Sequence, residues 1–282
     1  MIKRKNILFI GAGEMAEAMI SGMLQCDSFA EESITVVNRS NSERLQYVKA
    51  RYNVQTEHLQ NIALDDFDII ILAVKPKDAH EVIQLMQKET KPNQLILSVI
   101  AGISLTHLER HLPNQQQVMR VMPNTSISIG ESAMGISYGS SVSIENREFT
   151  KKWLASFGSV FVITEEQMDL FTAVAGSGPA YMYYFMQHME QVGLDYGFDE
   201  WMIRDMVTQT MIGAAKMVQQ TKETPMTLQK KVTSPNGTTE AGIKALETYE
   251  GGLAIRKAIE SACLRSEQIR LSFEKQGERV IQ

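Results

Sequence analysis

The sequence has little cysteine and no long apolar run. Its 282 residues include only Cys26 and Cys263, which are too few and too far apart for a disulfide framework or a thiolate metal site. We expect both to be buried or free thiols. The longest unbroken apolar run, Ile69 to Val74, is far too short to span a bilayer, and the start MIKRKNILFIG lacks the apolar length of a signal peptide. These absences predict a cytoplasmic protein with no membrane partner.

The sequence also lacks a block of basic residues. Its net charge of −5 without such a block argues against a nucleic-acid partner. His107 and His111 have helical i, i+4 spacing in SLTHLERHLP, where Ser104 can cap a short helix. A metal pair is one interpretation, but Glu109 projects from another face and no further ligand is near in sequence. A solvated helix is favoured, and we expect no metal site.

The chain has enough apolar residues to form the cores of two domains. The chain is 44% hydrophobic and 22% charged, which is typical of a globular protein of this length. The candidate strands are 6–10, 34–37, 68–74, 94–99, 117–122, 134–138 and 160–163. Amphipathic stretches at 14–25, 41–52 and 77–89 separate the early strands, which is the βαβ rhythm of a parallel sheet covered on both faces. We predict a Rossmann-type, doubly wound, mostly parallel α/β sheet over residues 1–163.

The first strand is followed by ILFIGAGEMAEAM, a G-x-G-x-x-A pattern at the opening of a helix. Gly11 permits a tight turn, Gly13 lets the backbone approach a pyrophosphate, and Ala16 allows close helix–strand packing. The predicted cofactor contacts here are Gly11, Ala12, Gly13, Glu14 and Met15. A tight turn without a ligand is the alternative.

The second strand ends at the position that distinguishes NADP from NAD. A carboxylate there would bind the ribose 2′-hydroxyl of NAD, whereas Asn38, Arg39 and Ser40 suit a 2′-phosphate. The sequence therefore favours NADP(H), with NAD(H) as a second cofactor. A surface arginine in a turn is the alternative interpretation of Arg39.

Small or polar residues follow the later strands as well. Because ligands of parallel sheets bind at the carboxyl ends of strands, their repetition predicts a continuous cofactor groove. The predicted contacts in this groove are Ala73, Val74, Lys75, Pro76, Ala101, Gly102 and Asn124.

Residues 164–282 are predicted to form an all-α domain. The expected helices are 165–195 with a break at 176–179, then 199–221, 226–232, 238–249 and 252–275. The helix at 199–221 is apolar over a wide stripe and rich in methionine, so it needs more cover than its own chain supplies. We predict a homodimer through these helices, with a self-contained bundle as the alternative.

Two glycine-containing segments lie in this helical part. In AGSGPAY the serine lacks the G-x-S-x-G spacing and strand–turn–helix context of an activated nucleophile. In KVTSPNGTTEAG, Gly237, Thr238 and Thr239 open a helix, so free backbone N–H groups and hydroxyls gather where an anion could bind. An ordinary helix cap is the alternative.

Six segments together resemble the pyrroline-5-carboxylate reductase family over essentially the whole chain. They are GAGEMAEAM, AVKP, SVIAGIS, RVMPNT, AGSGPAY and VTSPNGTTEAGIKALE. The chain departs from the family pattern at Asn236 in place of a glycine, at Ser126 in place of a proline, and at Lys231. Because asparagine tolerates left-handed backbone angles, the turn at Asn236 should be kept.

The resemblance implies a Rossmann domain followed by a helical dimerisation domain, with dimers in some members assembled into larger rings. It also implies hydride transfer from NAD(P)H to the C=N carbon of 1-pyrroline-5-carboxylate, a cyclic imino acid, which gives L-proline. The implied catalytic residues are Thr239 and Ser177, and the implied substrate contacts are Glu165, Gly178, Ser234, Gly237, Thr238 and Thr239.

Two other functions compete with this one. A different NADP-dependent imine or 3-hydroxyacid oxidoreductase would carry a catalytic lysine or aspartate on the long interdomain helix, but no lysine lies between Glu165 and Asp199. A non-catalytic NADP-binding regulator derived from a reductase is the third possibility, although Ser177, Gly237 and Thr239 are intact.

Overall fold

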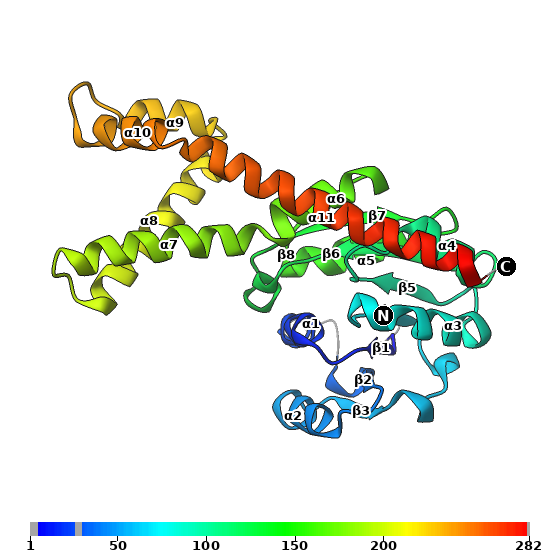
Figure 1. Ribbon diagram of the computed structural model, residues 1–282. Coiled ribbons are helices and arrows are strands. Elements are labelled where there is room, and N and C mark those ends of the chain that lie inside the picture. Colours follow the sequence, from blue (N-terminus) through cyan, green and yellow to red (C-terminus); the bar gives the residue numbers. More distant parts are fainter. Residues whose placement is uncertain (1–4, 26–29, 281–282) are drawn as a thin grey trace. The chain divides into compact units, whose positions relative to one another are not determined.

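The computed structural model describes residues 5–25 and 30–280, with the side chains of 275–280 excepted (Figure 1). Cys26 lies outside the described residues, and Cys263 is a free thiol. The chain divides into two compact units, Met1–Gly176 with Ala262–Gln282, and Ser177–Ser261.

The first unit is built on an eight-stranded sheet in the order β3-β2-β1-β4-β5-β6-β7-β8. The strands are β1 (Ile7–Ile10), β2 (Ile34–Asn38), β3 (Gln55–His58), β4 (Ile69–Leu72), β5 (Leu95–Ser98), β6 (Gln117–Met122), β7 (Ser132–Tyr138) and β8 (Gly158–Val162). Neighbours from β3 to β6 are parallel, β7 is antiparallel to β6, and β8 is parallel to β7. The predicted Rossmann-type, mostly parallel sheet is thereby confirmed, since the order 3-2-1-4-5-6 is that of dinucleotide-binding folds.

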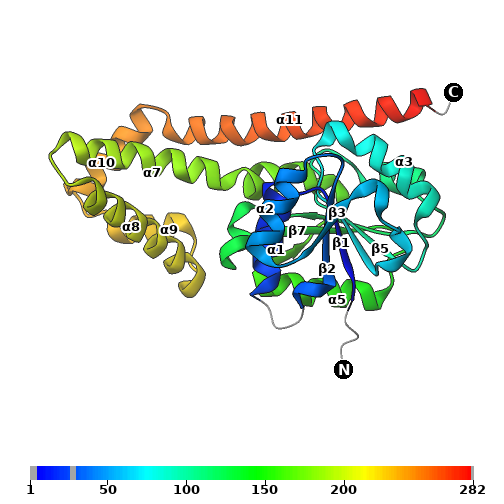
Figure 2. The same cartoon turned by 90° about the horizontal axis from the view of Figure 1, so that it is seen from below.

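Helices cover both faces of this sheet because successive strand residues point to opposite sides. In β1, Ile7 and Phe9 pack with α1 (Glu14–Leu24), α2 (Ser42–Tyr52) and α5 (Ile144–Leu154). Leu8 and Ile10 pack on the other face with α3 (Ala79–Glu89) and α4 (Leu105–His111). Figure 2 shows α1 and α3 on opposite sides of the strands. All four residues of β1 are at most 1% exposed, as expected for a strand buried on both faces.

The last part of α11 (Gly251–Val280) belongs to the sheet-containing unit. Gly102 has a φ of +78°, and a Cβ there would lie 2.3 Å from the Ile269 side chain, so only glycine allows this close approach. Asp169 is buried and accepts hydrogen bonds from Ser266 at 2.7 Å and from Arg270 at 2.9 Å. This anchoring carries residues 262–280 back to the first unit.

The division into units differs from the expected boundary between residues 163 and 164. The segment after β8 stays with the sheet: α6 (Met168–Phe171) and the π-helical turn Thr172–Gly176 lie in the first unit. Buried Met168 and Ala173 hold this segment in place. The end of α11 joins it through Asp169, which the helical periodicity of the sequence could not reveal.

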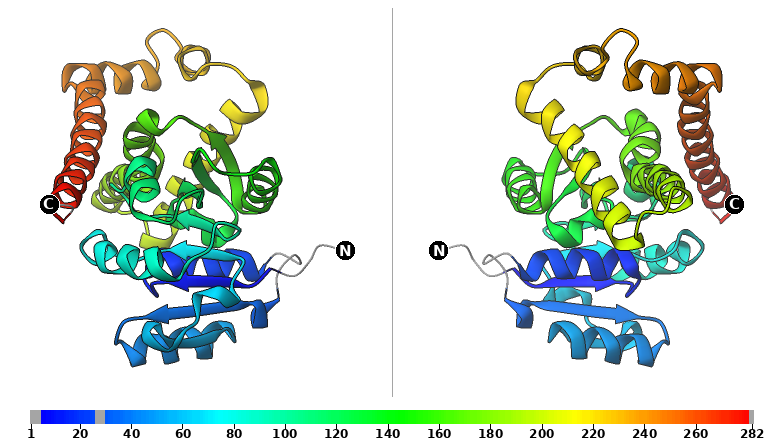
Figure 3. Two further views of the ribbon diagram at one scale, coloured as in Figure 1. Left: turned by 90° about the vertical axis from the view of Figure 1, so that its right-hand side faces the viewer. Right: turned by 90° about the vertical axis from the view of Figure 1, so that its left-hand side faces the viewer.

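The second unit is entirely helical. It contains α7 (Gly178–Asp195), α8 (Glu200–Thr221), α9 (Pro225–Val232), α10 (Thr238–Thr248) and the first part of α11. Side-chain caps mark two of the starts: Asp199 accepts from the N–H groups of Trp201 and Met202, and Thr224 accepts from Thr227. An exposed loop joins α9 to α10 (Figure 3). Among the described residues, no helix combines the length and apolar character that crossing a membrane requires.

The helix α4 is not the solvated helix that the sequence favours. His107 is only 5% exposed, stacks on His111 with ring centroids 4.2 Å apart, and meets the edge of Phe273 from α11. The distant Phe273 supplies the cover, which is why local sequence misses it. No group of three or more metal-ligating side chains occurs within the described part of the chain. Ser104 caps α4 as expected, accepting from the His107 N–H.

Burial of His107 predicts an acid-sensitive fold. Burial, followed by the charges of His111 and His80, lowers the pKa of His107 to about 4 from its ordinary 6.5. The unfolded chain then binds more protons than the folded chain between these values, so stability is full above pH 6.5 and falls as the pH drops towards 4. We expect His107→Gln to remove up to about 3 kcal/mol of this pH dependence.

The measurement is urea unfolding at several pH values between 4 and 7, with His107→Gln compared with wild type. As a control, Lys88→Gln changes an exposed residue in the last turn of α3 and should leave the pH profile as it is in wild type. Parallel profiles for wild type and His107→Gln would contradict the prediction.

Candidate functional site

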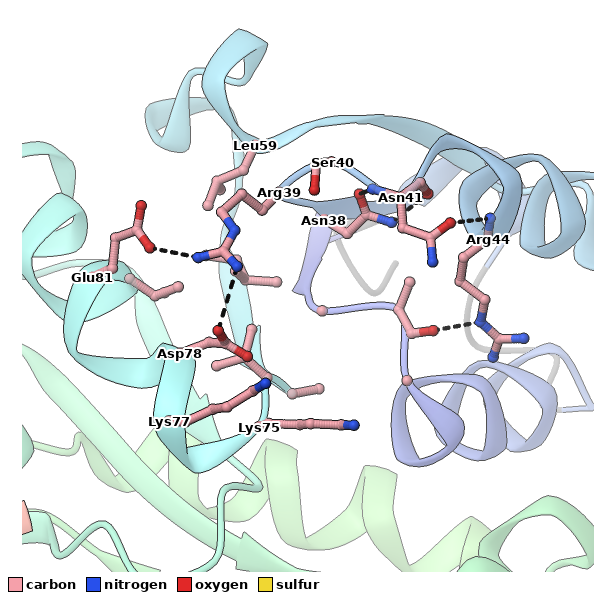
Figure 4. Close-up of a pocket in the computed structure, with 17 residues that line it drawn as sticks. Asn38, Arg39, Ser40, Asn41, Arg44, Leu59, Lys75, Lys77, Asp78 and Glu81 are labelled. Atoms are coloured by element: carbon pink, nitrogen blue, oxygen red, sulfur yellow. Dashed lines mark hydrogen bonds and ion pairs between the residues drawn. The ribbon is translucent and has the colours of Figure 1, made fainter.

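A cavity of about 370 Å³ opens at the carboxyl edge of the sheet in the first unit (Figure 4). It is lined by Ile10, Gly11, Ala12, Gly13, Asn38, Arg39, Ser40, Asn41, Arg44, Leu59, Ala73, Val74, Lys75, Lys77, Asp78, Glu81 and Val82. The structure thus brings together the ends of β1, β2 and β4, as the sequence predicts. The edge is the one at which ligands of doubly wound sheets bind.

The turn after β1 shapes the floor of this cavity. Gly11 has a φ of +115°, and a Cβ there would lie 2.4 Å from the backbone oxygen of Ala73, so no other residue fits. Gly13 is different, since a Cβ there would meet nothing within 4 Å. Gly13 is also the N-cap of α1 and makes no side-chain cap, so the first N–H groups of the helix remain available to an anion. This arrangement suits a pyrophosphate.

The turn after β2 presents a cation. Asn38 and Asn41 bond to each other, with the Asn41 N–H donating to Oδ1 of Asn38 at 2.9 Å and Nδ2 of Asn38 donating to the Asn41 carbonyl at 2.8 Å. Because Asn38 is engaged in the turn, Arg39 is the charged group offered to a ligand. Its guanidinium lies 3.0 Å from Glu81 and 3.6 Å from Asp78, and its side chain is 66% exposed.

Several charged residues of the cavity were not predicted from the sequence, and they lie at or just before the starts of helices. Arg44 comes from α2, Lys77 and Asp78 from the turn Pro76–Asp78 before α3, and Glu81 from α3. With Arg39 and Lys75, the lining carries four cations against two carboxylates. A net positive cavity of this kind attracts phosphate groups.

The remaining predicted cofactor contacts do not line the cavity. These are Glu14, Met15, Pro76, Ala101, Gly102 and Asn124. Gly102 packs against Ile269, as described above. Asn124 is buried and engaged, since its Nδ2 donates to the Ala175 carbonyl at 3.0 Å and its Oδ1 accepts from the Ser126 N–H at 3.1 Å. A proline at position 126 would have no N–H to donate, so Ser126 adds a bond to this turn.

Glu165 forms an ion pair with the buried Arg120 inside the first unit. Its Oε1 accepts from Nη1 of Arg120 and, at 3.1 Å, from the Leu105 N–H. Arg120 is 2% exposed, and both Nη2 of Arg120 and Oε2 of Glu165 are buried without a protein partner. The pair joins β6 to the start of α4, so holding these elements together is the role that its contacts display.

The predicted substrate loop lies in the second unit. Asn236 has a φ of +56°, the left-handed conformation expected for this turn, and its N–H donates to Glu240 at 2.8 Å. The Gly237 N–H donates to the Ser234 carbonyl at 3.0 Å, and Gly237 is the N-cap of α10. Ser234, Thr238 and Thr239 are exposed, while Ser177 and Gly178 are half-buried at the start of α7. Lys231 is paired with Glu223 at 2.6 Å.

The two glycines of the first turn should respond differently to substitution. Gly11→Ala forces a methyl group into the Ala73 carbonyl, so we expect a lower melting temperature. Gly13→Ala meets no protein atom but occupies ligand space, so dinucleotide affinity should fall about tenfold or more while the melting temperature stays within about 2 °C. Thermal unfolding and fluorescence titration with NADPH measure the two effects. Unchanged NADPH affinity in Gly13→Ala would contradict the prediction.

Two family models match the chain. Residues 165–269 match the model described as pyrroline-5-carboxylate reductase dimerisation. Residues 6–102 match the model described as NADP oxidoreductase, coenzyme F420-dependent. The second match contains the turn at Gly11 and all three strands, β1, β2 and β4, whose ends line the cavity.

Relatives match almost the whole chain. Pyrroline-5-carboxylate reductase 1 of Bacillus spizizenii is 46% identical over 272 residues, which are 96% of this chain and 92% of that protein. Pyrroline-5-carboxylate reductase 2 of Bacillus subtilis is 41% identical over 95% of this chain and 96% of its own. The crystal structure of 1-pyrroline-5-carboxylate reductase from Streptococcus pyogenes, 28% identical, covers 94% of this chain and 99% of its own with a TM-score of 0.84. The chain therefore belongs to the pyrroline-5-carboxylate reductase family.

Proposed function

We propose that this protein reduces 1-pyrroline-5-carboxylate to L-proline with hydride from NADPH, the last step of proline biosynthesis. The observation that carries the proposal is the 46% identity to a pyrroline-5-carboxylate reductase along 96% of the chain. The cationic cavity supports it independently, because a reductase of this kind needs a dinucleotide site.

NADPH fits the residues around the cavity. Gly11 and Gly13 leave room for a pyrophosphate beside the start of α1, and Arg39 offers a guanidinium for a 2′-phosphate. A Plasmodium falciparum pyrroline carboxylate reductase with NADP bound, 24% identical, shares the fold with a TM-score of 0.88. When bound, NADPH supplies the hydride that reduces the C=N carbon.

The loop at the start of α10 would hold the substrate. The backbone N–H groups of Thr238 and Thr239 suit the substrate carboxylate, because a helix start favours negative charge. The Gly237 N–H is already bonded to the Ser234 carbonyl and shapes the turn beside them. The Thr239 hydroxyl would hydrogen-bond the ring nitrogen and relay a proton to it from water, taking one proton up as it gives one away, since a protonated imine accepts hydride far more readily. Ser177, Gly178 and Ser234 would line this substrate site.

The contacts of Glu165 differ from the substrate contact expected for it. Its carboxylate is engaged by Arg120 and by the Leu105 N–H. We therefore assign Glu165 to holding β6 and α4 together.

A homodimer through the helical unit completes the proposal. α7 and α8 expose large apolar side chains, among them Tyr183 at 60%, Val192 at 57% and Trp201 at 70%. Apolar surface of this extent on neighbouring helices is typical of an interface. The match of residues 165–269 to a dimerisation model supports the same assembly. Larger rings of dimers, and action in the cytoplasm, are further parts of this proposal.

The activity is tested by following NADPH absorbance with 1-pyrroline-5-carboxylate. We expect turnover with the cyclic imine and none with an acyclic keto acid and amine. Tight NADPH binding without turnover would instead favour a regulator, and turnover of only the acyclic mixture would favour another imine reductase.

Substitution of Thr239 distinguishes a role in proton delivery from a role in carboxylate binding. If the hydroxyl passes the proton, Thr239→Ala should lower kcat about 100-fold with KM within threefold, and Thr239→Ser should restore most of it. Thr248→Ala changes the same residue type at the other end of α10 and should leave both constants unchanged. A rise in KM alone would assign Thr239 to carboxylate binding.

Arg39 should select NADPH over NADH. Its loss removes a charge-assisted bond to the 2′-phosphate, so we expect Arg39→Ala to raise KM for NADPH about 10- to 100-fold with little change for NADH. Lys88→Ala removes an exposed charge from the far end of α3 and serves as the control. Equal losses with the two cofactors would contradict this role.

A further inference from the structure

Arg44 reaches from α2 to the glycine turn of the cofactor cavity. Its Nε donates to the Ala12 carbonyl at 2.6 Å, as Figure 4 shows, and its Nη2 is bonded to Glu17 of α1. The Arg44 side chain is 27% exposed and that of Glu17 is 20% exposed, so this contact is largely shielded from water. One guanidinium thus holds both the turn and the helix that follows it.

Tyrosines of α2 fix the acceptor side of this contact. The hydroxyls of Tyr52 and Tyr47 donate to Oε1 of Glu17 at 3.0 and 3.2 Å. Burial opposes ionisation of Glu17, but the hydrogen bonds from Arg44 and the tyrosines outweigh it and lower the pKa of that carboxyl. The Arg44 guanidinium also lies over the Tyr47 ring, 4.9 Å from its centroid. Arg44 is therefore held in one orientation by groups that are not ligands of the cofactor.

The bonded carbonyl controls the amide that faces the ligand. The carbonyl of Ala12 and the N–H of Gly13 belong to one planar trans peptide, so they point in opposite directions. Fixing the carbonyl towards α2 fixes the direction of the Gly13 N–H. A charged donor on the carbonyl also polarises the peptide and makes its N–H a better donor.

We propose that Arg44 is a positioning residue that orients the Ala12–Gly13 peptide for the pyrophosphate, a task separate from the choice of 2′-phosphate by Arg39. This inference rests on the proposed use of a dinucleotide. Arg39 is exposed and pairs with carboxylates of the cavity wall, whereas Arg44 is bonded to the turn itself. The two arginines should consequently affect different parts of the cofactor.

The test compares dissociation constants of full-length variants for NADPH, NADH, ADP and adenosine 2′-phosphate by calorimetry. Arg44→Gln should raise the dissociation constants of NADPH, NADH and ADP by a common factor of about ten. It should leave the dissociation constant of adenosine 2′-phosphate unchanged. Arg39→Ala should raise the dissociation constants of NADPH and adenosine 2′-phosphate only. In steady state, Arg44→Gln should raise KM for both cofactors and keep kcat within twofold.

Two further variants separate geometry from charge. Arg44→Lys keeps the charge but lacks the planar fork that serves Ala12 and Glu17 together, so it should recover little affinity. Glu17→Gln keeps Arg44 but weakens the hydrogen bond that holds its guanidinium. It should give an intermediate loss of affinity for both NADPH and NADH. If Arg44→Gln does not fold, Glu17→Gln carries the test. Lys49→Gln removes an exposed charge from the same helix and should change nothing.

The alternatives give distinct results. A loss confined to NADPH and adenosine 2′-phosphate in Arg44→Gln would make Arg44 a direct phosphate ligand and overturn the proposal. Full recovery of affinity in Arg44→Lys would show that Arg44 acts only through its charge, and this result would overturn the proposal as well. Wild-type protein that binds neither NADPH nor NADH would overturn the proposed function and this inference with it.

Discussion

The close packing of the β1 turn against the end of β4 is the constraint on which the cofactor cavity depends. Gly11 brings its backbone so near to Ala73 that even a methyl group would collide with the carbonyl. The turn can then bend sharply into α1, which begins beside the cavity without a side-chain cap on its first N–H groups. Without this approach, the ends of β1, β2 and β4 could not line one space.

The charged side chains around the cavity come from different elements and make different contacts. The exposed Arg39 is balanced by Asp78 and Glu81, so a ligand phosphate would exchange partners with it rather than meet a bare cation. Arg44 is turned inward to the backbone and to Glu17. Such an arrangement keeps the arginines ordered before the ligand arrives, which lowers the entropy lost on binding.

The sheet could be predicted because its strands are apolar on both faces, and seven of the eight were found in this way. The exception, β3, has the sequence QTEH and lies at the sheet edge, where little burial is needed and no apolar pattern arises. The glycine turn and Arg39 were found because their residue types are tied to specific backbone or phosphate chemistry. Arg44, Asp78 and Glu81 were missed because charged residues on helix surfaces look the same whether they face solvent or a cavity.

Contacts between distant parts of the chain were also invisible in the sequence. His107 is buried by Phe273, and Gly102 is required by Ile269, in each case by a residue more than 150 positions away. Periodicity identifies a helix face but not the partner that covers it. The helical part could likewise be recognised as helical, yet the return of α11 to the sheet could not.

That return has a consequence for the order in which the protein is made. Residues 177–261 leave the ribosome before 262–280, so the sheet must wait for α11 while a whole helical unit is synthesised. During this interval Gly102 and His107 lack the cover that Ile269 and Phe273 of α11 supply. The nucleotide-binding half of this enzyme is therefore completed last, although most of it is translated first.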